Sequence, residues 1–73
     1  MSDQDLIDFC HLYGREIVAA KQAGDINAHN IVTYSLLIAR DNNRNDEHWT
    51  IFRNAVYEWI TAHGNKMQSE RYS

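Results

Sequence analysis

Residues 31–39 read IVTYSLLIA, a continuous apolar run that is rich in β-branched side chains. A run of this kind is compatible with a buried strand or with a buried helix. No other segment of the chain alternates with period two, and a lone strand cannot satisfy its backbone hydrogen-bonding groups. The sequence therefore favours a helix here, with a strand as the alternative.

The segment before this run also has helical spacing. Its apolar residues recur every three or four positions: Leu6, Phe9, Cys10, Tyr13, Ile17 and Ala20. Ser2 and Asp5 form a variant of the capping box, and Gly24 is suited to end a helix. We therefore predict one helix between Ser2 and Gly24, with Gly14 inside it at a cost of about 1 kcal/mol relative to alanine.

The rest of the chain supplies a second and a third helix. Asp25 or Asn27 can cap the second helix, with Ile26 outside it as a hydrophobic staple, and residues 41–45 form a polar loop. The third helix has an apolar stripe made of Trp49, Phe52, Val56, Trp59, Ile60 and His63.

The ends of the third helix complete the predicted architecture. Asn45 or Asp46 can cap its start, and Gly64 is well placed to end it. The expected fold is all-α: a compact domain of three helices over residues 1–64 with short loops and the second helix central. Residues 65–73 are expected to form a polar, flexible tail.

Three helices of this kind carry more apolar surface than one small bundle can bury. On the second helix, Leu36 and Leu37 point away from the Ile31 side, and a middle helix can touch only two others. The first helix has a similarly wide apolar face. We expect the surplus to contact a second copy of the chain or another protein; the alternative is a tight monomer in which long polar neighbours cover it.

Two groups of residues are the candidates for partner binding. Val32, Leu36 and Leu37 form the first group, on the second helix. Arg53 and Tyr57 form the second, on the third helix, because an arginine beside an aromatic residue is typical of binding hot spots. A cation–π stack of Arg53 on Tyr57 would explain this pair without a partner.

Composition limits the other function classes. The chain has 73 residues, a formal charge of −3 and a single cysteine, Cys10. So small a chain leaves little room for an elaborate active site, and it cannot form an internal disulfide, so we expect it in the reducing cytoplasm. Its acidic, polar start is unlike a signal peptide, and no apolar run approaches the roughly 20 residues that span a bilayer.

No catalytic, metal-binding or cofactor-binding residue is predicted, and no small-molecule substrate. The four histidines and Cys10 lack the short spacings that place two metal ligands on one helix face. Cys10 lies in an apolar stripe, where a thiol behaves as a small hydrophobe. The glycines are too far apart for a phosphate-binding loop.

Nucleic-acid binding is the runner-up. Residues 20–24 followed by a helix resemble the first half of a helix-turn-helix motif. Asn30 stands where that motif needs an apolar residue, however, and Arg40 is the only basic residue of the would-be recognition helix. Lys and Arg are scattered rather than clustered. The alternative reading is thus a helical dimer that regulates nucleic acid through a DNA-binding partner.

The sequence therefore predicts a small, non-enzymatic protein-interaction module that acts as an inhibitor or adaptor of a partner protein and self-associates. Accessory proteins of phages and mobile elements are often small, acidic and helical in the same way. This is an analogy of size, charge and fold class, not a resemblance of sequence.

Overall fold

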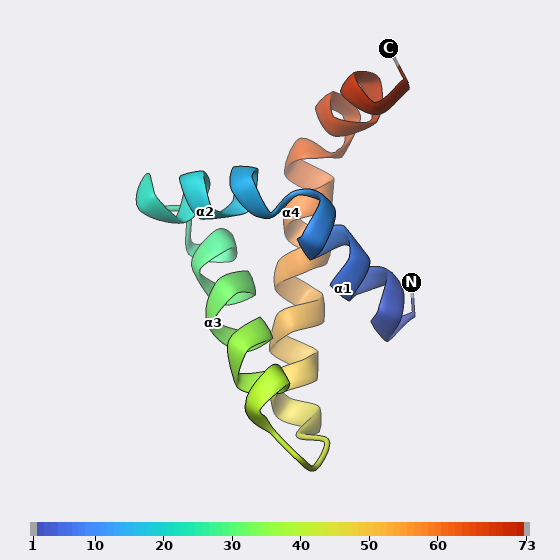
Figure 1. Ribbon diagram of the computed structural model, residues 1–73. Coiled ribbons are helices and arrows are strands. Elements are labelled where there is room, and N and C mark those ends of the chain that lie inside the picture. Colours follow the sequence, from blue (N-terminus) through green and yellow to red (C-terminus); the bar gives the residue numbers. More distant parts are fainter. Residues whose placement is uncertain (1, 73) are drawn as a thin grey trace.

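The computed structural model describes the backbone of residues 2–72 and the side chains of residues 2–63. Within that part the helices are α1 (Asp3–Leu12), α2 (Gly14–Gln22), α3 (Ile26–Arg40) and α4 (Asp46–Tyr72). α3 and α4 lie antiparallel and side by side, α2 packs on the first turns of α3, and α1 lies across α4 (Figure 1). No strand occurs in residues 2–72, so the all-α prediction is confirmed and residues 31–39 are helical.

The predicted number of helices is wrong, because the first helix is broken in two. Tyr13 has the dihedral angles φ −110° and ψ 21°, and it both ends α1 and precedes α2. The break lets α1 lie on α4 while α2 packs on α3 (Figure 1), and Leu6 of α1 and Ile17 of α2 are both buried in the core. Gly14 lowers the helical propensity at this point. Apart from its chain neighbours and the backbone of its own helix, no heavy atom lies within 4 Å of the position that a Cβ at Gly14 would occupy, so no close helix contact requires this glycine.

The helix ends follow the local signals of the sequence. Ser2 and Asp5 form a reciprocal capping box: Ser2 Oγ accepts from Asp5 N at 3.2 Å, and Ser2 N donates to Asp5 Oδ2 at 3.1 Å. Gly24, with φ 94°, closes α2 in a Schellman arrangement in which Asp25 N donates to Ala20 O at 3.0 Å. The capping box and the role of Gly24 in ending the helix were both predicted from the sequence.

Asp25 is the residue that starts α3. Its Oδ1 accepts hydrogen bonds from Asn27 N at 2.9 Å and from Ala28 N at 3.1 Å. Asn27 therefore does not cap the helix. Ile26 is the first residue of α3 rather than a staple outside it, and its side chain is 66% exposed.

Asn45 caps α4, since its Oδ1 accepts from His48 N at 3.2 Å. The expected end at Gly64 is wrong, because the helix continues through this glycine to Tyr72. A glycine in a helix interior costs only about 1 kcal/mol, which flanking helical residues can outweigh. The flexibility expected for residues 65–73 concerns a segment that lies outside the residues whose side chains are described.

The core draws on all four helices. Its buried side chains are Leu6, Ile17, Ala28, Ile31, Phe52, Ala55, Val56 and Trp59. Four of these eight belong to α4, while α3 is the helix that packs closely on both α2 and α4, as expected for the predicted central element. In the described part of the chain, no helix has the length and apolar character needed to span a membrane.

Candidate protein-interaction groove

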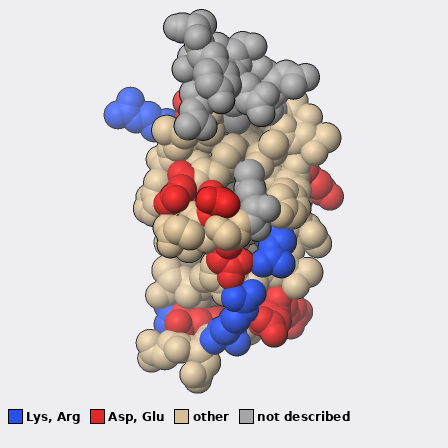
Figure 2. All heavy atoms as spheres, turned by 90° about the vertical axis from the view of Figure 1, so that its right-hand side faces the viewer, with Lys and Arg blue, Asp and Glu red and all other residues tan. Residues whose placement is uncertain are grey.

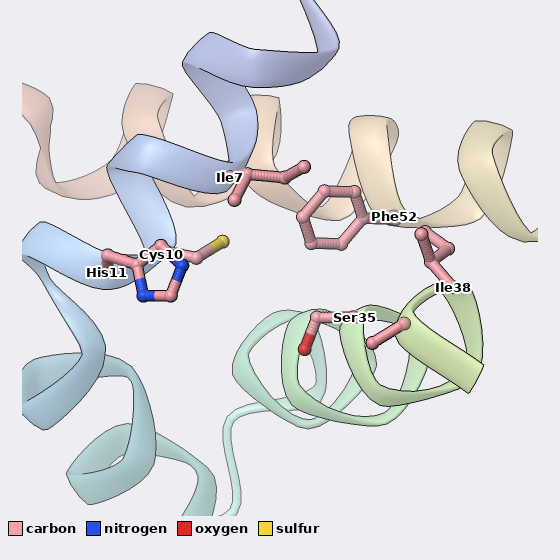
Figure 3. A pocket seen from close by; sticks show the side chains of 7 residues that line it. Ile7, Cys10, His11, Ser35, Ile38 and Phe52 are labelled. Atoms are coloured by element: carbon pink, nitrogen blue, oxygen red, sulfur yellow. The ribbon is translucent and has the colours of Figure 1, made fainter.

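A groove opens between α1 and α3, which diverge on either side of α4. It encloses about 340 Å³ and has α1 and α3 as its walls and α4 as its floor (Figure 3). The residues that line it are Ile7, Cys10, His11, Ser35, Ile38, Ala39 and Phe52.

The lining of the groove is apolar, and its few polar groups are weak or occupied. Cys10 points its sulfur into the groove, and burial raises the pKa of this thiol to about 11, so it stays protonated at neutral pH (Figure 3). Ser35 Oγ is turned back to its own helix, where it donates to Val32 O at 2.9 Å. His11 is exposed at the rim. The groove therefore suits apolar side chains and offers no activated nucleophile.

The first group of predicted contact residues lies partly on the α3 wall. Leu36 is 61% exposed. It comes directly after Ser35 in the chain and lies one turn before Ala39, and both of these residues line the groove. Val32 lies one turn before Leu36 on the same flank of α3 and is half-buried. Leu37 is also half-buried but points to a different side of the helix. Leu36 with Val32 thus continues the groove outward, whereas Leu37 does not belong to this flank.

The second predicted group, Arg53 and Tyr57, lies one turn apart on α4, and Arg53 is engaged by a carboxylate of α1. Arg53 Nη2 donates to Asp3 Oδ1 at 2.7 Å, and Arg44 Nη1 donates to Asp3 Oδ2 at 2.6 Å. These hydrogen bonds, first that of Arg44 and then that of Arg53, lower the pKa of Asp3. Tyr57 is 39% exposed, and the cation–π contact found among the described side chains joins Arg44 to Trp49 at 5.1 Å.

We call Asp3, Arg44 and Arg53 the carboxylate clamp. It fastens the first turn of α1 to α4 and to the loop before α4, and it therefore holds one wall of the groove in place. Sequence analysis did not select Asp3 or the α1 wall residue Ile7 as site residues. No local signal marks Asp3, because the clamp joins residues far apart in the chain, whereas Ile7 lies on the wide apolar face predicted for the first helix.

Other exposed apolar side chains are consistent with the predicted surplus of apolar surface. Leu12 at the end of α1 is 60% exposed and Val18 on α2 is 45% exposed. Neither lines the groove, but Leu12 directly follows the lining residue His11, so Leu12 on α1 and Leu36 on α3 are both exposed apolar side chains next to lining residues.

Charge is mixed rather than concentrated. On the face shown in Figure 2, acidic and basic side chains lie next to each other along the molecule. A further pair joins His48 Nδ1 to Asp41 Oδ2 at 3.2 Å and ties the loop before α4 to its first turn. Among the described side chains, no three His, Cys, Asp or Glu residues gather as a potential metal site.

Comparison of the chain with protein-family models, with curated proteins and with solved structures found no match. Inferences about function therefore rest on the groove and its surroundings.

Proposed function

We propose that this chain is a non-enzymatic protein-interaction module that acts as an inhibitor or adaptor of a partner protein and self-associates. The observation that supports it is the apolar groove between α1 and α3 together with the exposed Leu36 beside it. An apolar groove between helices is the form in which many proteins receive the apolar face of an amphipathic helix.

The chemistry of the groove favours a protein segment over a reaction. A catalytic site needs a nucleophile or an acid–base group whose pKa suits the reaction. Cys10 has a pKa raised to about 11, which opposes thiolate formation, and the hydroxyl of Ser35 already donates to its own helix.

The distribution of basic residues weighs against the nucleic-acid alternative. Phosphate contacts need clustered and available Lys and Arg side chains. Of the described basic residues, Arg44 and Arg53 are bound to the carboxylate of Asp3. No specific observation favours nucleic acid as the partner.

The test is capture of partners from the native host, followed by reconstitution with the purified partner. Ala39→Arg introduces a long charged side chain at the groove, and Asn54→Arg places the same side chain on an exposed position of α4 as the matched control. We expect Ala39→Arg to weaken the partner's Kd at least tenfold and Asn54→Arg to leave it unchanged. The proposal would be overturned if both variants bound the partner equally well, or if the wild-type chain captured no protein from the host.

A further inference from the structure

A single residue joins α1 to α2, and it interrupts what is otherwise one helix. Tyr13 alone separates Leu12 from Gly14, and its φ of −110° and ψ of 21° depart from helical values. α1 and α2 therefore lie at an angle to each other (Figure 1). The apolar residues nevertheless keep one helical spacing from Leu6 to Ala20, through the break. A conformational change at Tyr13 would turn α1 and α2 into a single helix.

The break costs the chain backbone hydrogen bonds. Tyr13 N donates to Phe9 O and Ile17 N donates to Tyr13 O, both at 3.0 Å. Between these two bonds the regular pattern of residue i to residue i−4 is interrupted, and no side chain caps the start of α2. A continuous helix would form the missing bonds. The position of α1 on α4 must therefore stabilise the chain by more than the break costs.

α1 is held in this position by apolar side chains and by the carboxylate clamp. Leu6 is 0% exposed, and Phe9 and Cys10 pack partly buried against the same core. In the clamp, the carboxylate of Asp3 meets one guanidinium at 2.6 Å and another at 2.7 Å. All these contacts join α1 to parts of the chain that lie beyond the break. They can form equally well with an α1 that a second copy supplies.

Straightening at Tyr13 within one chain would remove these contacts. Leu6 and the face of α4 beneath it would enter water, and Asp3 would leave two guanidinium groups unpaired. Exchange of α1 between two copies avoids this loss, because each α1 takes the same place on the α4 of the other copy. The contacts of the single chain are then kept, and the hydrogen bonds missing at the break are gained.

We infer that two copies exchange α1 about a two-fold axis, with a straight helix through Tyr13 in each copy. The surface that binds the partner is the one that α1 covers in the single chain. Its charge complementarity is that of the clamp, because an acid of one copy meets two arginines of the other. The inference rests on the self-association in the proposed function and specifies its form.

Charge reversal in the clamp distinguishes an exchanged α1 from one that stays on its own chain. Asp3→Arg places like charges together in the clamp, and so does Arg44→Asp combined with Arg53→Asp. Each variant alone should melt at a lower temperature than the wild type and remain near 8.5 kDa in light scattering.

The two variants should complement each other when they are refolded together from urea. In the exchanged dimer, the introduced arginine meets the introduced aspartates, and the unchanged Asp3 meets the unchanged arginines. The mixture should therefore contain at least ten times more mixed dimer than homodimer by native mass spectrometry, and melt above either variant alone. An α1 that stays on its own chain gains nothing from mixing.

Glu58→Arg is the matched control for Asp3→Arg. It reverses an exposed carboxylate of α4 that has no ion pair among the described side chains. Mixed with the double variant, it should enrich no mixed dimer, because Asp3 would still face the introduced aspartates in one of the two contacts.

Gly14 gives an independent test of the straight helix. It is the first residue of α2, a position that tolerates proline, whereas proline interrupts a continuous helix. Gly14→Pro should therefore keep its helical content and stay monomeric. Gly14→Ala favours a continuous helix and should lower the Kd of the dimer at least threefold.

The outcomes separate this inference from the proposed function. Complementation of the charge-reversed variants, with a monomeric Gly14→Pro, supports the exchange of α1. A wild-type dimer without complementation, or a Gly14→Pro variant that dimerises as tightly as the wild type, overturns the exchange while self-association stands. A wild-type chain that is monomeric at every concentration overturns both, and the capture experiment with Ala39→Arg then tests the remaining part of the proposed function.

Discussion

The carboxylate of Asp3 and the guanidinium of Arg53 stand 50 positions apart in the chain and meet at 2.7 Å. This ion pair, with Arg44 on the other oxygen of Asp3, joins the first turn of α1 to α4 and to the loop before α4. Because α1 is one wall of the groove, these ion pairs link that wall, through its first turn, to α4 and to the loop before it.

Replacing Asp3 with Asn should lower the melting temperature at neutral pH and make the chain less sensitive to acid. The pKa of Asp3 is lowered, first by Arg44 and then by Arg53, so its carboxylate stabilises the fold above the ordinary pKa of an aspartate. That stabilisation is lost as the pH falls through the lowered pKa. Thermal unfolding followed by circular dichroism at pH 7 and at pH 2.5 checks this.

Glu58→Gln is the control for Asp3→Asn, because Glu58 is an exposed carboxylate on α4 with no ion pair among the described side chains. It should change the melting temperature little. If Asp3→Asn and Glu58→Gln behave alike at both pH values, the clamp does not stabilise the docking of α1.

Replacing Asp25 with Ala should destabilise the chain by about 1 kcal/mol, the usual cost of removing an N-cap. Asp25 Oδ1 accepts two backbone hydrogen bonds at the start of α3. Urea denaturation gives the free energy of unfolding. Asp25→Asn keeps the accepting oxygen and should restore most of the loss; a variant series in which Ala and Asn are equally unstable would contradict the capping role.

The two glycines near the ends of α2 should respond oppositely to alanine. Gly24 has φ 94°, a conformation that L-residues avoid, so Gly24→Ala should cost about 1–2 kcal/mol. Gly14 has free space around its Cβ position and a helical neighbour on its C-terminal side. Gly14→Ala should therefore raise stability by about 0.4–1 kcal/mol. Calorimetry on both variants decides whether the break at Tyr13 needs the glycine, since a loss at Gly14 would show that it does.

Leu36 and Ile31 lie on the same helix but should differ strongly in their effect on folding. Ile31 is 1% exposed, so Ile31→Ala should lower the free energy of unfolding by about 2–4 kcal/mol. Leu36→Lys should change that free energy by less than about 0.5 kcal/mol at concentrations too low for association. A large loss of helicity in Leu36→Lys would make Leu36 part of the core instead.

Cys10 should react slowly with thiol reagents in the native chain. Burial raises its pKa from an ordinary 9.0 to about 11, which lowers the thiolate fraction at pH 8 roughly 100-fold, since each pKa unit is a factor of ten. Alkylation rates between pH 8 and pH 11.5, followed by mass spectrometry and compared with the urea-unfolded chain, test this. A native rate that levels off near pH 9 would mean that the thiol is not shielded.

Local signals made most of the helix ends predictable, whereas the arrangement of helices was not. Ser2 with Asp5 and Gly24 with Asp25 act through neighbours in the chain, so their roles can be read directly. The break at Tyr13 was missed because apolar residues keep their helical spacing across it. Only the need to pack α1 on α4 and α2 on α3 makes the break favourable.

The candidate site was partly predictable for the same reason. The exposure of Leu36 follows from a helix that is apolar on more sides than its neighbours can cover. The groove depends on how far α1 and α3 diverge, and the role of Arg53 depends on Asp3 at the opposite end of the chain. Neither relationship can be recognised from the spacing of residues in the sequence.

The placement of the two tryptophans on α4 gives the chain two separate fluorescent reporters. Trp59 is 2% exposed, has an indole N–H without a hydrogen-bond partner among the described side chains, and stacks on His63 at 4.1 Å. Its emission should be blue-shifted. Trp49 lies beneath the guanidinium of Arg44, so its emission reports on the loop and the clamp. Phenylalanine at either position isolates the other signal, and movement of α1 can then be followed apart from unfolding of the core.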